Sequence, residues 1–171
     1  MKCPIDGATL ETITYEGIRI ERCPECGGIW LDADELGHIV EAREKRFTQG
    51  ERDALAQAKP VFGVPVDELD RELVSPKSGT KLKPVNYGGD SGIIINVCPN
   101  GEGIWLDACE LESIQALVEG WEQKLPEDLA KHRELLDKVE MKQDLEDDVS
   151  YSRFGVINAI VNGIIDKVIM R

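Results

Sequence analysis

The chain has 171 residues, with 33 acidic against 20 basic side chains and a formal net charge of −13. That charge repels a phosphate backbone and removes the counterion release that drives most nucleic-acid affinity, so generic DNA or RNA binding is disfavoured. No stretch reaches the roughly 18 uninterrupted apolar residues of a membrane span, and the first cysteine motif leaves no room for a signal peptide. We therefore expect a cytoplasmic protein whose five cysteines favour a metal site over disulfides.

Residues 1–46 predict a small unit, a β-hairpin followed by a helix. Apolar positions roughly alternate through residues 9–22, and the turn is expected near Glu16. Two Cys-Pro motifs, at Cys3 and Cys23, stand at the open ends of this hairpin. A unit of about 40 residues is too small to be stable on its apolar core alone, so it needs a metal ion or a neighbour.

The cysteine motifs have the spacing of a zinc site. Two residues between ligands let a tight turn present both side chains to one ion, as in Cys23-x2-Cys26. Cys3 and Asp6 have the same spacing, with a carboxylate in place of the second thiolate. Asp6 is the favoured fourth ligand, with His38 or a water as the alternative. Four protein ligands predict one structural Zn²⁺ per chain, because catalytic zinc keeps an open position.

A helix with the same start signals is expected after each of two hairpins. Asp32 is the expected N-cap of the first helix, and Glu35 stands three residues later as its capping-box partner. The same pair recurs at Asp107 and Glu110. A second copy of the hairpin is therefore also followed by a helix.

Residues 47–72 are expected to be a linker, and residues 73–120 repeat the first unit without most of its ligands. Alignment of the two blocks places Ser75, Ser78, Cys98 and Gly101 at the positions of Cys3, Asp6, Cys23 and Cys26. Serine and glycine cannot complete a zinc site, so this unit is expected to be metal-free, with Cys98 and Cys109 as buried or spare thiols. Trp30 and Trp105 also correspond, and both are expected in the core between ribbon and helix.

The C-terminal part is expected to be helical. Residues 121–149 predict a charged helix and residues 150–171 an amphipathic one. The apolar face of the last helix is too wide to leave in water, so it must meet the body of the protein, a second copy or another protein. We expect a protein partner or a homo-oligomer through residues 150–171.

The two blocks resemble the TFIIB-type zinc ribbons of the bacterial and archaeal transcription factor zinc-finger family. Repeats of that family run Cys-Pro-x-Cys or Cys-Pro-x-Asp, Gly, a hairpin, Cys-Pro-x-Cys-x-Gly-x-Trp-Leu-Asp and then Glu-Leu. Residues 3–40 match this pattern closely, and residues 75–113 match as a degenerate copy. The resemblance implies a rubredoxin-like zinc-binding fold and a link to transcription or nucleic acids.

Together these patterns predict an α+β protein with two small rubredoxin-like zinc-ribbon units, of which only the first binds metal. No His-Glu pair, nucleophile motif or phosphate loop is present, so we expect no enzymatic activity. A cytoplasmic zinc-binding protein that acts as a protein-interaction or scaffold module fits best. The alternatives are a transcription-linked or nucleic-acid-associated factor, and a thiol-based redox sensor in which oxidation of Cys23 and Cys26 releases zinc.

Overall fold

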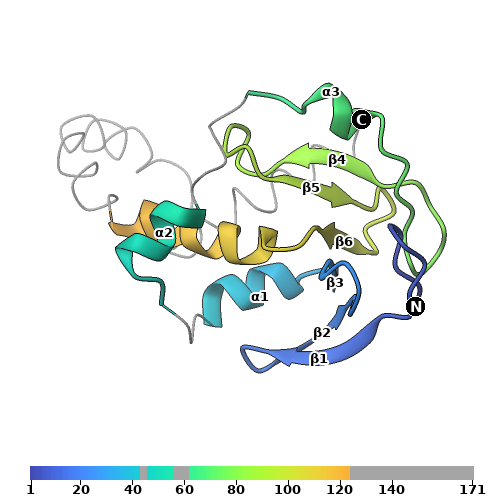
Figure 1. Cartoon of the computed structure of the whole chain (residues 1–171), viewed down its shortest axis with the longest axis horizontal. Coiled ribbons are helices and arrows are strands. Elements are labelled where there is room, and N and C mark those ends of the chain that lie inside the picture. The colour runs from blue at the N-terminus through green and yellow to red at the C-terminus, as the bar shows by residue number, and fades with distance from the viewer. Residues whose placement is uncertain (43–45, 56–61, 124–171) are drawn as a thin grey trace, which may run out of the picture.

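A computed structural model describes residues 1–42, 46–55 and 62–123 (Figure 1). It is a mixed α+β structure in which helices pack on an antiparallel sheet. The amphipathic helix predicted for residues 150–171, and all but the first three residues of the charged helix predicted for 121–149, lie outside the described residues. Among the described helices, none is long and apolar enough to cross a membrane.

Six strands form one sheet in the order β1-β2-β3-β6-β5-β4, with every neighbouring pair antiparallel. The strands are β1 (Glu11–Tyr15), β2 (Ile18–Arg22), β3 (Ile29–Asp32), β4 (Lys83–Asn86), β5 (Ile94–Val97) and β6 (Gly103–Leu106). The central pair, β3 and β6, joins the unit of residues 1–46 to that of residues 73–120, which we call the first and second halves. Trp30 of β3 lies opposite Trp105 of β6. The halves are therefore not separate units beside each other, because hydrogen bonds run across the whole sheet.

The first hairpin forms where the sequence predicts it. β1 and β2 pair from Glu11 opposite Arg22 to Tyr15 opposite Ile18, which leaves a two-residue turn. Both turn residues have positive φ, 48° at Glu16 and 80° at Gly17. Two positive φ values are typical of the type I′ turn, whose twist matches that of the strands.

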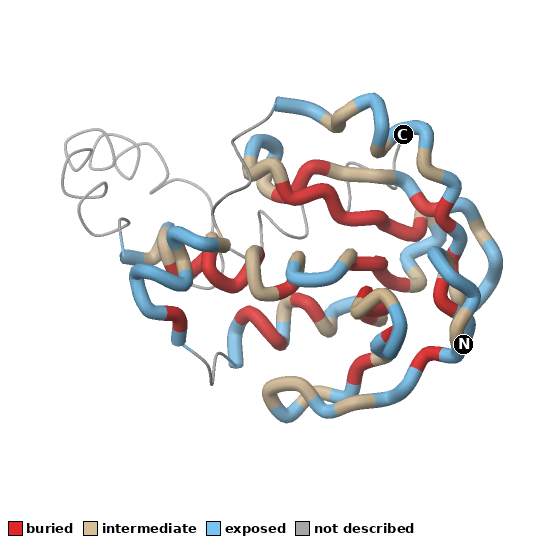
Figure 2. Tube along the Cα trace, in the orientation of Figure 1, coloured by how far each residue is buried: buried red, intermediate tan, exposed pale blue. Residues whose placement is uncertain are grey.

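One face of the sheet is covered by two helices, α1 (Glu35–Ala42) and the helix of residues 110–123. Figure 2 shows the buried residues concentrated along the inner strands and on the inner sides of these helices. The helices contribute Leu36, Ile39, Val40, Leu111, Ile114 and Val118 to this core. Leu31 and Leu106 meet them from the two central strands, so one apolar core extends under both halves.

The two tryptophans are completely buried, but on the other face of the sheet. They share a second apolar cluster with Cys3, Cys23 and Cys98. The expected position between ribbon and helix is therefore wrong, because Leu31 and Leu106 alternate with the tryptophans and take the helix side. Each ring also packs on a glycine of the other half: a Cβ on Gly28 would lie 2.3 Å from Trp105, and one on Gly103 would lie 2.8 Å from Trp30.

The stretch expected to be a linker contains α2 (Gln49–Leu55) and α3 (Val66–Leu69). Its first part is attached to the helix of residues 110–123 through Glu119, whose side chain is only 4% exposed. The carboxylate accepts hydrogen bonds from the Phe47 backbone N–H at 3.2 Å and from the Arg52 guanidinium at 3.3 Å. Residues 47–55 are thus part of the folded body.

Only half of each predicted capping box is present. The Glu35 carboxylate accepts a 2.8 Å hydrogen bond from the Asp32 backbone N–H, and Glu110 accepts the equivalent 2.7 Å bond from Asp107. The Asp32 side chain accepts instead from the Trp30 indole N–H at 2.8 Å. The Asp107 side chain likewise accepts from the Trp105 indole N–H at 3.0 Å. The prediction that the two aspartates are side-chain N-caps is therefore wrong, because their carboxylates bind the tryptophans.

Burial raises the pKa of Glu110 from 4.5 to about 8. Between these pH values the unfolded chain loses a proton that the folded protein keeps, so the free energy of unfolding should fall as pH rises, by up to about 1.4 kcal/mol per pH unit. Glu110→Gln keeps an oxygen that can accept from Asp107 and should flatten this dependence. Urea unfolding at pH 5, 6.5 and 8 would measure it, with Glu72→Gln as an exposed control. Equal slopes in all three proteins would contradict the expectation.

Candidate metal centre

Two tight turns present the cysteine motifs at the end of the first hairpin. In the N-terminal turn the Cys3 N–H donates to the Ala8 carbonyl at 2.8 Å, and the Gly7 N–H donates to the Cys3 carbonyl at 3.0 Å. The second turn repeats both bonds, from the Cys23 N–H to the Gly28 carbonyl at 2.8 Å and from Gly27 to Cys23 at 3.1 Å. Gly7 and Gly27 both have a φ of 75°, a left-handed conformation that glycine adopts at little cost.

The turns bring four potential ligands together. One donor atom each from Cys3, Asp6, Cys23 and Cys26 lies within 4.8 Å of all the others. The Sγ atoms of Cys3 and Cys26 are 3.6 Å apart, and the Cys23 Sγ lies 3.3 Å from Asp6 Oδ2. Tetrahedral zinc with Zn–S bonds of about 2.3 Å and Zn–O bonds of about 2.0 Å requires S–S separations of about 3.8 Å and S–O separations of about 3.5 Å.

Backbone N–H groups point at two of the sulfur atoms. The Ile5 N–H lies 3.4 Å from Cys3 Sγ, and the Gly28 N–H lies 3.4 Å from Cys26 Sγ. Such donors stabilise a thiolate, whereas burial opposes it and raises the pKa of Cys3 to about 12. A backbone hydrogen bond from Ala8 lowers the pKa of Asp6, which keeps that carboxylate charged.

The donor set fits zinc. Three soft thiolate donors and one carboxylate are ligands that zinc accepts, and binding would displace the thiol protons. Bound zinc would supply a cross-link between the two turns. All four donors come from the protein, so the residues present form the closed type of site in which the ion holds the chain together.

The structure distinguishes between the two side chains that are candidates for the fourth ligand. Asp6 belongs to the cluster, whereas His38 lies on α1 and is not part of it. Of the remaining cysteines, Cys98 is completely buried and Cys109 is exposed. Glu102, which contacts Cys98 in the second half, is not among the residues predicted from sequence. Its signal in the sequence is a glutamate at the position where the first motif has Gly27.

Comparison with known families agrees with this geometry: residues 2–42 match the transcription factor zinc-finger family. They form a TFIIB-type zinc ribbon. The matched zinc ribbon covers both turns, the first hairpin, β3 and α1. Neither the curated proteins nor the solved structures contain a match to the chain.

Proposed function

We propose that this chain is a non-enzymatic, zinc-stabilised scaffold that acts through protein–protein contacts, with residues 73–120 as a degenerate, metal-free copy of the zinc ribbon. The observation that carries the proposal is the single sheet, in which β3 of the zinc ribbon pairs with β6 of the second half. A closed four-ligand site offers no open position for a substrate. Zinc and the second half then serve to build a rigid surface.

The backbone of the second half supports its origin as a copy. The Ser75 N–H donates to the Thr80 carbonyl at 2.8 Å and the Gly79 N–H to the Ser75 carbonyl at 2.8 Å, as in the turn at Cys3. The Cys98 N–H donates to the Gly103 carbonyl at 2.9 Å, as Cys23 does to Gly28. The first turn is therefore kept with both of its bonds, and the second turn keeps its closing bond, where ligands are lost.

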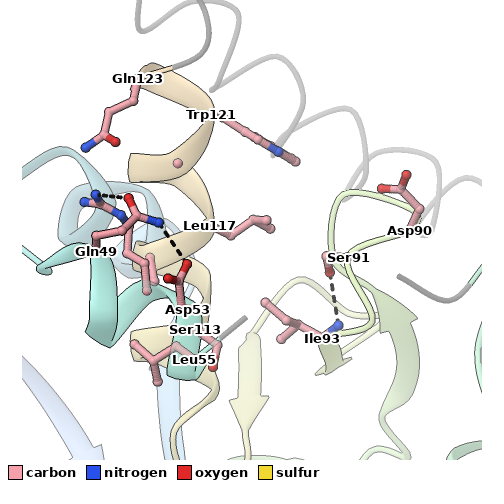
Figure 3. A pocket seen from close by; sticks show the side chains of 13 residues that line it. Gln49, Asp53, Leu55, Asp90, Ser91, Ile93, Ser113, Leu117, Trp121 and Gln123 are labelled. Carbon is pink, nitrogen blue, oxygen red and sulfur yellow. Dashed lines mark hydrogen bonds between the residues drawn. The ribbon is translucent and has the colours of Figure 1, made fainter. Parts of the chain in front are cut away.

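A groove of about 440 Å³ lies on the helix side of the second half (Figure 3). In Figure 3, Leu117 and Trp121 project from the helix of residues 110–123 toward the turn that carries Asp90 and Ser91. Trp121 remains 37% exposed, which is unusual for so large an apolar side chain. An apolar wall with acidic residues at its edges is typical of a surface that binds an apolar segment with positive charge.

We propose that residues 150–171 of a second copy occupy this groove. That segment carries three basic residues and one acidic residue in a chain of net charge −13, so its charge complements Asp53 and Asp90 in the groove. Arg52 also lines the groove, but its charge is paired with Glu119. It is also rich in isoleucine and valine, which matches the wall formed by Leu117 and Trp121. Reciprocal insertion would give a closed, two-fold symmetric dimer.

Sedimentation or native mass spectrometry over a range of concentrations tests the dimer. Trp121→Glu, and separately Ile160→Asp in the segment, should raise the dimer dissociation constant at least about tenfold, because each places a charge in an apolar contact. Val66→Asp is the matched control, since Val66 is 73% exposed on α3, away from the groove. A wild-type monomer at all concentrations would exclude the second copy as occupant and point to the same chain or to another protein.

A transcription-linked role is the second candidate, because the matched family is described as a transcription factor zinc-finger. Four basic side chains of the described part are already paired with carboxylates: Arg52, Arg71, Lys77 and Lys81. These pairs and the net charge leave little to attract a phosphate backbone. Salt-dependent binding of a labelled DNA or RNA duplex at micromolar concentration would favour this candidate over the scaffold.

A further inference from the structure

In the second half, one carboxylate oxygen lies among the side chains that correspond to zinc ligands. Glu102 Oε2 accepts hydrogen bonds from the hydroxyls of Ser75 and Ser78, each at 2.7 Å. The Cys98 thiol donates to the same oxygen at 3.4 Å. These three donors stand at the positions of Cys3, Asp6 and Cys23 in the alignment, so three of the four ligand positions converge on a single atom.

A change in the second turn accompanies this arrangement. In the zinc ribbon the left-handed residue is Gly27, directly after the ligand Cys26; in the second half it is Gly101, at the position of Cys26 itself, with a φ of 72°. The turn is accordingly one residue shorter. The Gly101 N–H donates to the carbonyl of Cys98, three positions earlier, at 3.0 Å, whereas the Gly27 N–H donates to Cys23, four positions earlier. The fourth ligand is thus replaced by a glycine, and Glu102 stands where the zinc ribbon has Gly27.

We propose that the Glu102 carboxylate takes the place of the zinc ion and closes the second ribbon as a charge-inverted centre. The zinc ribbon would hold a cation among anionic ligands, whereas the second half holds an anionic oxygen among neutral hydroxyl and thiol donors. The proposal rests on the duplication argued under the proposed function. In this proposal Ser75, Ser78 and Cys98 still bind a central charge, as the zinc ligands do, but that charge is negative.

The surroundings of the carboxylate fit this assignment. Hydrogen bonds from Ser75 and Ser78 lower the pKa of Glu102, so the group is charged at neutral pH. Ser75 is 2% exposed and Cys98 is completely buried, so these two donors have little access to water and depend on Glu102, whereas Ser78 is exposed and Glu102 itself is half-buried. Hydrogen bonds to an ionised acceptor are roughly twice as strong as neutral ones, which is what a substitute for a metal cross-link requires.

The first test removes the charge and keeps the shape. Glu102→Gln should lower the melting temperature of the zinc-loaded full chain by about 5 °C or more, and excess zinc should not restore it. Glu25→Gln, in the exposed part of the zinc-ribbon turn, removes the same charge and should leave the melting temperature within about 2 °C of the wild type. An equal effect of the two variants would overturn the role of Glu102 while leaving the scaffold proposal intact.

The second test converts the centre back to a metal site. The quadruple variant Ser75→Cys, Ser78→Asp, Gly101→Cys and Glu102→Gly gives the second half the ligand set and turn glycine of the zinc ribbon. Native mass spectrometry should find two zinc ions per chain in this variant and one in the parent and in Glu102→Gln. A folded quadruple variant with one zinc would overturn the duplication itself, and two zinc ions in the parent would overturn the metal-free centre.

Discussion

Cys26→Ser should abolish zinc binding and destabilise the zinc ribbon, whereas Cys98→Ser should leave one zinc per chain. The zinc ligands lie on two turns that are tied to each other by the four side chains of the cluster, so removing one ligand releases this cross-link. Structural zinc contributes on the order of 10 kcal/mol to the folding of small finger peptides, and we expect the variant to lose at least about 3 kcal/mol of unfolding free energy. Zinc content and urea unfolding of both variants measure the difference.

Cys98→Ser is a stringent control because Cys98 is completely buried, whereas Cys26 is only half-buried, and it occupies the equivalent turn. The substitution keeps a hydroxyl that can donate to Glu102, so its cost should be about 1 kcal/mol. Loss of zinc from Cys98→Ser, or full retention of zinc by Cys26→Ser, would show that the metal is bound by a different set of residues.

Trp105→Ala should destabilise the whole described body by about 3–5 kcal/mol, the usual cost of truncating a fully buried aromatic side chain. Trp105 is completely buried, pairs across the sheet with Trp30, and packs against Gly28 of the zinc ribbon. The cavity would open at the junction of the two halves, so both should unfold in one transition at lower urea concentration. Urea unfolding followed by circular dichroism gives the magnitude.

Trp121→Ala provides the matched control, because it removes a tryptophan that is 37% exposed at the groove. This variant should lose less than about 1.5 kcal/mol in the monomer. Equal costs for the two variants would mean that the tryptophans at the centre of the sheet do not hold the halves together. Two separate transitions in Trp105→Ala would show that each half is stable alone.

The local features of the zinc ribbon are predictable from sequence because each depends on neighbouring residues. The turn at Glu16 and Gly17 needs only two residues of positive φ between two strands whose apolar residues alternate. The half capping box from Asp32 to Glu35 likewise spans only four residues. Spacing in the cysteine motifs predicts the ligand cluster for the same reason, since a tight turn fixes both side chains.

The pairing of β3 with β6 could not be predicted in this way, because it joins Trp30 to Trp105 across most of the described chain. A short apolar run is compatible with a buried strand or with part of a helix, so periodicity does not identify its partner. The partners of the Asp32 and Asp107 side chains cannot be predicted for a related reason: both carboxylates accept hydrogen bonds from the indole N–H groups of the buried tryptophans. Burial of a polar N–H requires an acceptor, and only the folded structure shows which one is near.

We propose one zinc ion per chain, held by Cys3, Asp6, Cys23 and Cys26, and a second half that binds none. Native mass spectrometry of the purified full chain, recorded under conditions that preserve bound metal and again after exposure to a chelator, tests this directly. We predict one zinc per chain before chelation and none after it. Two zinc ions per chain, or a folded chain that contains no metal at any zinc concentration, would contradict a single zinc site at these four residues.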